Sequence, residues 1–167
     1  MFIQTIDGTL SEMHITIRDA QPDDVESLVE LLQELFAIEA DFTVDTNQQR
    51  KGLVLLLDGC GKHRCLKVAQ VDDQVVGMCS AQALISTAEG GWVALVEDMV
   101  VSASYRGTGV GRRLMAAIEM WARQRGMTRL QLLADRTNFA ALDFYDKMGW
   151  CPTQLICLRR QWDLKTQ

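Results

Sequence analysis

The chain has 167 residues, a hydrophobic content of 48% and only two prolines, which fits one globular domain and excludes a disordered polymer. Its net charge of −5 argues against general nucleic-acid binding. The longest apolar run, around Leu53–Leu57, is too short to cross a bilayer. With no secretory signal and with five cysteines that form no CxxC pair, we expect a cytoplasmic protein with free thiols.

The first third of the chain predicts a short strand followed by two helices. "HITIRDA" at 14–20 alternates in polarity and is typical of a strand. Pro22 and two aspartates mark the start of a helix over 21–42, whose apolar side chains repeat at helical spacing. A second, shorter helix is predicted over 46–59. We therefore expect the chain to have three parts, which are an N-terminal extension (1–13), one domain (14–162) and a C-terminal tail (163–167).

Beyond Arg64 the period changes to that of strands. Two runs separated by Asp72–Asp73 predict an antiparallel hairpin, and a third, mostly apolar strand follows. The remainder predicts helix, strand, helix and a final strand. The strand–helix–strand order implies a right-handed crossover and therefore a parallel pair within a mixed sheet. The predicted elements of this part are 64–71, 74–86, 90–101, 109–126, 128–134, 138–149 and 151–162.

A glycine-rich loop, "SYRGTGVGRRL" at 104–114, precedes the helix predicted over 109–126. Residues 105–136 carry seven arginines against two acids, whereas residues 1–104 carry six basic residues against seventeen acids. Free N–H groups at a helix start favour an anion, so we interpret the loop as a phosphate site. The spacing matches neither the GxGxxG dinucleotide fingerprint nor a Walker loop. The structural alternative is a tight turn without a ligand.

Two stretches together resemble the GNAT superfamily of N-acetyltransferases. "EDMVVSASYRGTGVGRRLM" resembles the acetyl-coenzyme A motif of that family, and "NFAALDFYDKMGW" resembles its next motif. The resemblance extends from about His14 to Arg160. It implies an α/β fold (α+β by some schemes) with a single domain. The mixed, mostly antiparallel sheet would have a central parallel pair splayed around acetyl-CoA and helices on both faces.

The resemblance also implies where acetyl-CoA would bind. The pyrophosphate would lie on backbone N–H groups of the glycine loop, and the pantetheine amides would pair with the exposed backbone of the preceding strand. Side chains on that strand can therefore stay apolar. The implied cofactor-binding residues are Met99, Val100, Val101, Arg106, Gly107, Thr108, Gly109, Val110, Gly111, Arg112, Asn138 and Tyr145.

The resemblance assigns two catalytic residues, and each has a structural alternative. Glu97 would be the general base, directly or through a water. Alternatively, Glu97 and Asp98 lie at a bulge and reach solvent or nearby loops. Tyr145 would protonate the departing thiolate, since a phenol with a pKa of about 10 is protonated at neutral pH. Alternatively, Tyr145 is a core aromatic residue, and Asn138 is a helix N-cap.

The implied function is transfer of the acetyl group of acetyl-CoA directly to a primary amine, and we favour a small cationic acceptor. In the family, the first two helices help to wall the acceptor pocket, and this region is rich in acids, although such acids are more often a solvated face. The alternatives are a protein or peptide N-acetyltransferase and a non-catalytic acyl-CoA-binding module. We expect no metal, nucleic-acid or membrane partner, interpret Cys60, His63 and Cys65 as a turn, and leave a homodimer open. The acids are Asp23, Asp24, Glu26, Glu30, Glu34, Glu39, Asp41 and Asp45.

Overall fold

A five-stranded sheet organises the larger part of the chain in the computed structural model, which describes residues 3–6, 9–12, 14–38 and 44–162. Residues 1–132 form one compact unit and residues 133–167 a second. The strands of the sheet follow the order β3-β4-β5-β6-β7. They are β3 (Ile15–Asp19), β4 (Arg64–Val71), β5 (Gln74–Ser86), β6 (Gly91–Val101) and β7 (Leu130–Leu132).

The sheet is mixed, as predicted. Neighbouring strands from β3 to β6 run antiparallel, whereas β6 and β7 run parallel. The parallel pair lies at one edge of this sheet and not at its centre. The α/β class and the mixed sheet are therefore confirmed, and the parallel pair is displaced because the final strand that was expected is not formed.

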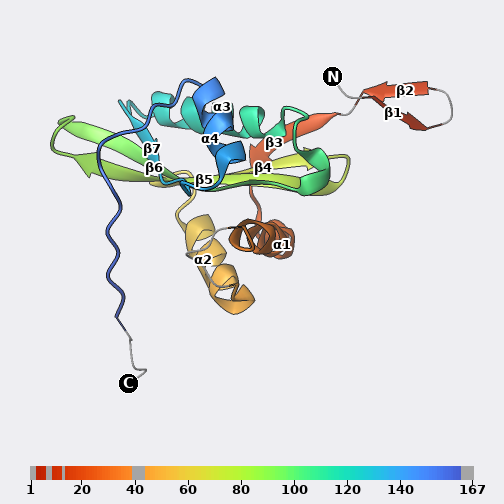
Figure 1. Cartoon of the computed structure of the whole chain (residues 1–167). Helices are drawn as coiled ribbons and strands as arrows, with labels where there is room; N and C mark the ends of the chain where they lie inside the picture. Colours follow the sequence, from red (N-terminus) through yellow and green to blue (C-terminus); the bar gives the residue numbers. More distant parts are fainter. Residues whose placement is uncertain (1–2, 7–8, 13, 39–43, 163–167) are drawn as a thin grey trace. The chain divides into compact units, whose positions relative to one another are not determined.

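Helices cover both faces of the sheet in the larger unit. The α1 and α2 helices lie on one face and α3 on the other (Figure 1). A short 3-10 turn that contains Pro22 leads into α1, as the sequence predicts. Another 3-10 turn precedes the glycine loop. The bounds are η1 (Pro22–Asp24), α1 (Val25–Phe36), α2 (Thr46–Asp58), η2 (Ala103–Tyr105) and α3 (Val110–Gln124).

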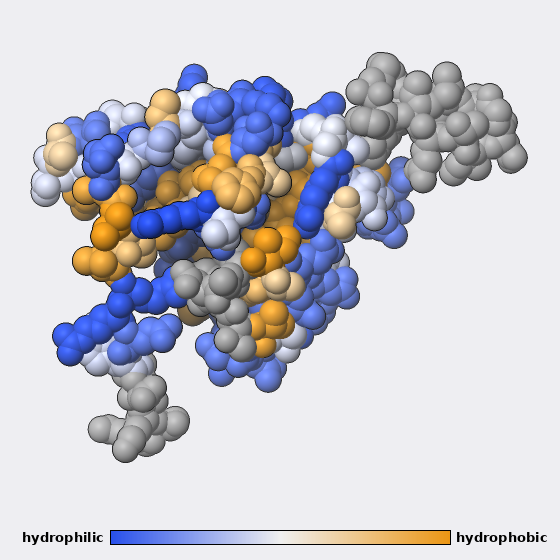
Figure 2. Space-filling view, viewed as in Figure 1, coloured by the Kyte–Doolittle hydropathy of each residue, from blue (hydrophilic) through white to orange (hydrophobic). Residues whose placement is uncertain are grey.

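Burial on both faces explains why the central strands are continuously apolar. Residues 76–81 of β5 are all buried, because helices cover each side of that strand. On the α1–α2 side, the core includes Leu28, Leu32, Leu53 and Val68. On the α3 side, the inner face of that helix is buried at helical spacing, through Val110, Leu114, Ile118 and Trp121. In the α1–α2 layer, hydrophobic residues reach the surface between hydrophilic ones (Figure 2).

The second unit contains α4 (Phe139–Lys147) and an extended segment in place of a predicted strand. The expectation of a strand over 151–162 is wrong for this structure, since no strand is assigned there. Leu155, Ile156 and Leu158 are 87%, 66% and 86% exposed. A strand needs a hydrogen-bonded partner as well as suitable residues, and β-propensity depends on that context.

A hairpin at the N-terminus was not predicted. β1 (Ile3–Ile6) pairs antiparallel with β2 (Thr9–Glu12) in a sheet separate from the main one. From the sequence we expected only an extension over 1–13, without a hairpin. Among the residues that the structure describes, no helix combines the length and the apolar character needed to span a membrane.

Gly77 provides a test of how closely β5 and β6 approach. A Cβ added there would lie 3.0 Å from the carbonyl oxygen of Val100 and 3.2 Å from Cδ1 of Leu114. We expect Gly77→Ala to lower the free energy of unfolding by about 1–2 kcal/mol, because backbone and packed helix must both yield. Chemical denaturation measures this change.

Gly52→Ala is the matched control, since Gly52 lies within α2 and a Cβ there meets nothing within 4 Å. We expect this variant to gain about 0.5–1 kcal/mol from helix propensity. A neutral or stabilising Gly77→Ala would contradict the close approach of the two strands.

Candidate active site

A bulge in β6 reorients the strand at the residues that the sequence analysis singled out. Met78 pairs with Val100 and Ser80 pairs with Glu97, so Asp98 and Met99 together oppose the single residue between them on β5. Asp98 has a φ of 50°, which is uncommon for a residue other than glycine. The extra residue and this left-handed conformation interrupt the regular alternation of side chains at Glu97 and Asp98.

The two carboxylates have different surroundings. Glu97 is exposed and accepts a hydrogen bond from Nε2 of Gln82 at 2.8 Å. Asp98 is half-buried, and its Oδ2 lies 3.2 Å from the hydroxyl of the fully buried Ser80. Burial, together with the nearby charge of Glu97, raises the pKa of Asp98 to about 6, against the lowering effect of the Ser80 hydroxyl. The side chain of Asp98 therefore changes between its protonated and charged forms near pH 6.

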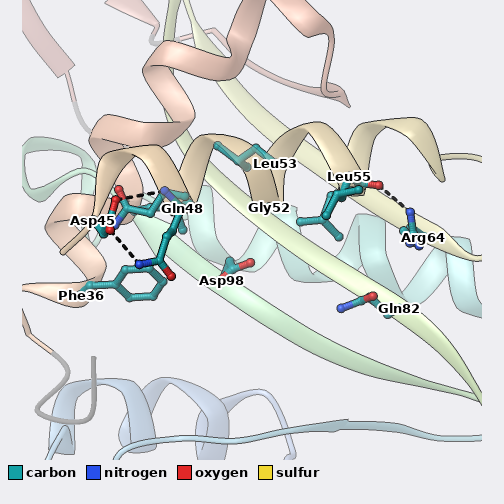
Figure 3. Close-up of a pocket in the computed structure, with 12 residues that line it drawn as sticks. Phe36, Asp45, Gln48, Gly52, Leu53, Leu55, Arg64, Gln82 and Asp98 are labelled. Atoms are coloured by element: carbon teal, nitrogen blue, oxygen red, sulfur yellow. Dashed lines mark hydrogen bonds between the residues drawn. The ribbon is translucent and has the colours of Figure 1, made fainter. Parts of the chain in front are cut away.

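A cavity of about 470 Å³ lies between α1, α2 and the sheet. Asp98 faces the space beneath α2, with Phe36 and Gln48 toward one end and Gln82 and Arg64 toward the other (Figure 3). Its wall combines apolar and polar side chains. The described residues that line it are Leu32, Phe36, Asp45, Gln48, Gln49, Gly52, Leu53, Leu55, Leu56, Arg64, Gln82 and Asp98.

The backbone of β6 is open beyond the bulge. β7 pairs with β6 only through Ala94, Leu95 and Val96. Among the described residues, no strand pairs on that side with Met99, Val100 or Val101, and their role in binding pantetheine stays a prediction. Val100 itself is buried, so its side chain belongs to the core.

The glycine loop runs directly from this open backbone into α3. Gly107 and Gly109 have φ values of 76° and 92°, and Gly109 is the N-cap of α3. The first intrahelical hydrogen bond runs from the N–H of Arg113 to the carbonyl of Gly109 at 3.1 Å. The N–H groups of Val110, Gly111 and Arg112 thus lie in the first turn, before the helix uses them, where a helix can receive an anion.

Side-chain contacts fix the approach to this loop. The hydroxyl of Thr108 donates to the carbonyl of Tyr105 at 2.7 Å. Nε of Arg106 donates to the carbonyl of Val101 at 2.9 Å, so the side chain braces the turn. Arg112 is exposed, and no ion-pair partner for it occurs among the described residues.

Glu34 on α1 links the cavity wall to the loop. Its carboxylate accepts hydrogen bonds from the hydroxyl of Ser102 and the N–H of Ala103, both at 3.2 Å. It also lies 3.7 Å from Nη2 of Arg106. Because Leu32 and Phe36 on the same helix line the cavity, α1 contacts both halves of the site.

Several acids of the α1 region contact other elements of the protein. Asp24 forms a bidentate pair with Arg18 at 2.7 and 2.8 Å, which holds its pKa below the ordinary value. Glu26 pairs with Arg50 on α2. Asp45 lines the cavity while it caps α2. Two of the predicted wall acids, Glu39 and Asp41, lie outside the described residues.

Cys79 lies opposite the bulge and is fully buried. Burial raises the pKa of its thiol well above the ordinary value, so the thiol stays protonated and is a poor nucleophile. Within the described ranges, no group of three or more His, Cys, Asp and Glu side chains is arranged to hold a metal ion.

The remaining predicted residues lie on α4 in the second unit. Asn138 is the N-cap of that helix, and its side chain accepts from the N–H of Ala141 at 3.1 Å. Tyr145 is half-buried, with ring centroids of Phe144 and Trp150 at 5.3 and 6.0 Å. The capping role of Asn138 is thus present, and the cofactor roles of both residues stay predictions.

The sequence predicted Glu97 as the base, with Asp98 named beside it in the alternative of a bulge, and it did not predict Gln49 as a cavity residue. Asp98 was adjacent, and its only signal was a second carboxylate in an apolar strand. Gln49 shares a helical face with Leu53 and Leu56, and all three line the cavity. A polar residue at an apolar position of α2 is a signal that could have identified it.

A family model and similar proteins of known sequence all indicate one family. The model of the Acetyltransferase (GNAT) family matches residues 25–150. An aminoalkylphosphonate N-acetyltransferase of Salmonella typhimurium is 28% identical over 134 residues, which cover 80% of this chain and 83% of that protein. An N-alpha-acetyltransferase 80 of Mus musculus is 46% identical over 56 residues, covering 34% of this chain but only 17% of the mouse protein.

Solved structures share the fold. An aminoglycoside N-acetyltransferase, AAC(6')-Iy, solved in complex with CoA, has a TM-score of 0.77 at 18% identity, over 90% of this chain and 97% of that one. A structure described as a transcriptional regulator from Bacillus halodurans has a TM-score of 0.74 at 24% identity, over 89% of this chain and 100% of that one. At these identities the likeness is one of fold.

The raised pKa of Asp98 predicts a pH-dependent stability effect. Between about pH 4 and 6, the folded protein keeps a proton on Asp98 that the unfolded chain has lost. This residue therefore stabilises the fold less as pH rises through that window, and its charge is fully unfavourable above it. We expect Asp98→Asn to raise the melting temperature by a few degrees at pH 8 and to change it little near pH 4.

Asp73→Asn, at an exposed position of the β4–β5 turn, is the matched control and should show no such pH dependence. Melting curves of the three proteins across this pH range provide the measurement. Equal effects of Asp98→Asn at both pH values would mean that the carboxyl of Asp98 titrates normally.

Proposed function

Because the chain belongs to the GNAT acetyltransferase family, we propose that it transfers the acetyl group of acetyl-CoA directly to a primary amine of a small molecule. The observation that carries this proposal is the continuity of the open β6 backbone, the glycine loop and the first turn of α3, beside a cavity that contains a carboxylate of raised pKa. A donor and an acceptor could then meet at the β6 bulge.

The donor would lie along the β6 backbone and the glycine loop. Main-chain groups of Met99, Val100 and Val101 would pair with the pantetheine amides. The N–H groups of the loop and of the first turn of α3 would hold the pyrophosphate, since they are the first free donors of that helix. Arg112 could add a charge-assisted contact from its exposed side chain, whereas Arg106 already braces the turn.

The acceptor amine must lose a proton before or during its attack on the thioester carbonyl. We propose that the Glu97–Asp98 pair accepts this proton. Asp98 is the main proton acceptor, because it lines the cavity and has a pKa of about 6. The nitrogen forms the amide bond as the carbon–sulfur bond breaks. The thiolate of CoA then takes a proton. The resemblance to the family motif makes Tyr145 the proposed donor of that proton.

The acceptor class is tested by incubating the protein with acetyl-CoA and two sets of amines, small primary amines and short peptides. Release of free thiol and the mass of the product report turnover. We expect acetylation of small amines. The short match to a mouse N-alpha-acetyltransferase favours a peptide α-amine as the second candidate, so turnover of peptides alone would support that function. Binding of CoA without any turnover would support a non-catalytic module.

The two carboxylates are distinguished by Asp98→Asn and Glu97→Gln. We expect Asp98→Asn to lower kcat by about a hundredfold, since a positioned general base contributes on this scale. It should also remove the inflection near pH 6 in the rate profile, below which protonated Asp98 cannot act. Glu97→Gln should lose less than about tenfold and keep the inflection. The reverse pattern would make Glu97 the base.

Tyr145→Phe tests the proposed acid. We expect kcat to fall by about a hundredfold while CoA affinity, measured by calorimetry, stays unchanged, because the hydroxyl acts only on the departing thiolate. An acetyl thioester with a more acidic thiol should restore most of the loss, since its leaving group needs less protonation. Undiminished turnover with acetyl-CoA would exclude Tyr145 as the acid.

A further inference from the structure

The wall of the cavity contains one arginine that the proposed reaction does not use. Arg64 is the first residue of β4, and it lines the cavity at the end away from Phe36 (Figure 3). It is half-buried. Of the described residues that line the cavity, Arg64 alone carries a positive charge. A ligand in this cavity therefore meets a guanidinium group at one end.

The guanidinium group of Arg64 has spare hydrogen-bond donors. Its Nη1 donates to the carbonyl of Leu55, which is one of the last four carbonyls of α2 and has no partner within the helix. Among the described residues this is the only hydrogen bond of the side chain, and no Asp or Glu forms an ion pair with it. A guanidinium has five N–H donors. Closing the end of α2 thus explains one donor and leaves the charge without a counter-charge.

Gly59 holds this guanidinium group in place by leaving room for it. A Cβ added to Gly59 would lie 2.6 Å from both Cδ and Nη1 of Arg64, and 2.9 Å from Cζ. The φ of Gly59 is −98°, which residues with a side chain also adopt. Glycine is therefore required at this position by the Arg64 side chain and not by the backbone.

The sheet separates Arg64 from Asp98 by a short distance. Arg64 pairs with Gln82 across β4 and β5, whereas Ser80, two residues along β5, contacts Asp98. Two residues of a strand span about 7 Å, and their side chains share a face. Because Arg64 and Asp98 both line the cavity, it offers a cation and a carboxylate that are offset along the strands. A ligand that contacts both has its own two charges separated by a short spacer.

We propose that Arg64 binds a carboxylate of the acceptor, so that the substrate class is an amino acid whose amine and carboxylate are separated by a short hydrocarbon chain. This inference rests on the proposed acetyl transfer and names its acceptor more narrowly. Asp98 receives the amine, and the guanidinium of Arg64 receives the carboxylate through charge-assisted hydrogen bonds. Apolar side chains of α2, such as Leu53 and Leu56, line the same cavity beside the hydrocarbon chain. Arg64 is a specificity-determining residue and takes no part in proton transfer.

The test compares amino acids with their uncharged amides. 4-Aminobutanoate with 4-aminobutanamide is one pair, and 5-aminopentanoate with 5-aminopentanamide is another. The members of a pair share length and shape and differ in the negative charge. For the wild-type enzyme we expect kcat/KM to be about tenfold higher with the carboxylate of at least one pair. Arg64→Gln should reduce that ratio to about one, and Arg64→Lys should keep part of it because the charge remains.

Gly59→Ala tests the position of the guanidinium without removing its charge. The added methyl group must displace the Arg64 side chain, so the ratio should fall as it does in Arg64→Gln. Gly91→Ala is the matched control for this variant, since a Cβ at Gly91 meets nothing within 4 Å. Arg123→Gln, at an exposed position of α3 outside the cavity wall, is the control for Arg64→Gln. Both controls should keep the wild-type ratio.

Melting curves establish that each variant folds before its kinetics are compared. An arginine that only closes the end of α2 would lower the melting temperature on substitution and would leave the ratio unchanged. A wild-type ratio near one for both pairs, or an Arg64→Gln variant that slows both members equally, would therefore overturn the inference while acetyl transfer stands.

Calorimetry separates this inference from the proposed function. Each amine is titrated into the protein saturated with CoA, so that binding is measured without chemistry. Selective binding of the amino acid that depends on Arg64, without turnover with acetyl-CoA, would remove the proposed function and retain the recognition site. Turnover of both members of a pair without selective binding would do the reverse.

Discussion

The bulge at Asp98 and Met99 is the constraint on which the rest of the site depends. One additional residue in β6 shifts the pairing with β5 and places Asp98 in a left-handed conformation. A regular strand would direct Glu97 and Asp98 to opposite faces and would continue its ladder. With the bulge, Asp98 reaches the cavity, and the backbone beyond it has no β7 partner among the described strands. In the proposed reaction, this one irregularity would serve both the acceptor side and the donor side of the site.

Electrostatics explains why two adjacent carboxylates can coexist there. The exposed Glu97 is held by Gln82, and its charge helps to raise the pKa of Asp98. The buried hydroxyl of Ser80 opposes this effect by stabilising the Asp98 carboxylate, and it also bonds the carbonyl of Glu97. Burial is the largest cause of the shift, so a less buried Asp98 would be an acid of ordinary strength.

Periodic patterns predicted most of the fold, and the exceptions have local physical causes. Three features could be predicted because each depends on neighbouring residues. They are the amphipathic repeat of α3, the start of the first helical segment at Pro22, and the hairpin about Asp72. The absence of a strand over 151–162 could not be predicted, since the β-propensity of these residues does not show whether a partner strand is present. A bulge at Glu97 and Asp98 was one of the two alternatives, and the structure confirms it, but the sequence does not say which of the two carboxylates the bulge turns toward the cavity.

The burial of Gln49, in contrast, could be predicted from the sequence. Its position on α2 is one that Leu53 and Leu56 predict to be buried, so its burial follows from helical spacing alone. An apolar residue there would pack against the core without leaving polar atoms unpaired. Polar side chains, among them Asp98, Arg64 and Gln82, share the cavity wall with apolar side chains of α1 and α2, which is the arrangement that orients a small molecule as well as holding it.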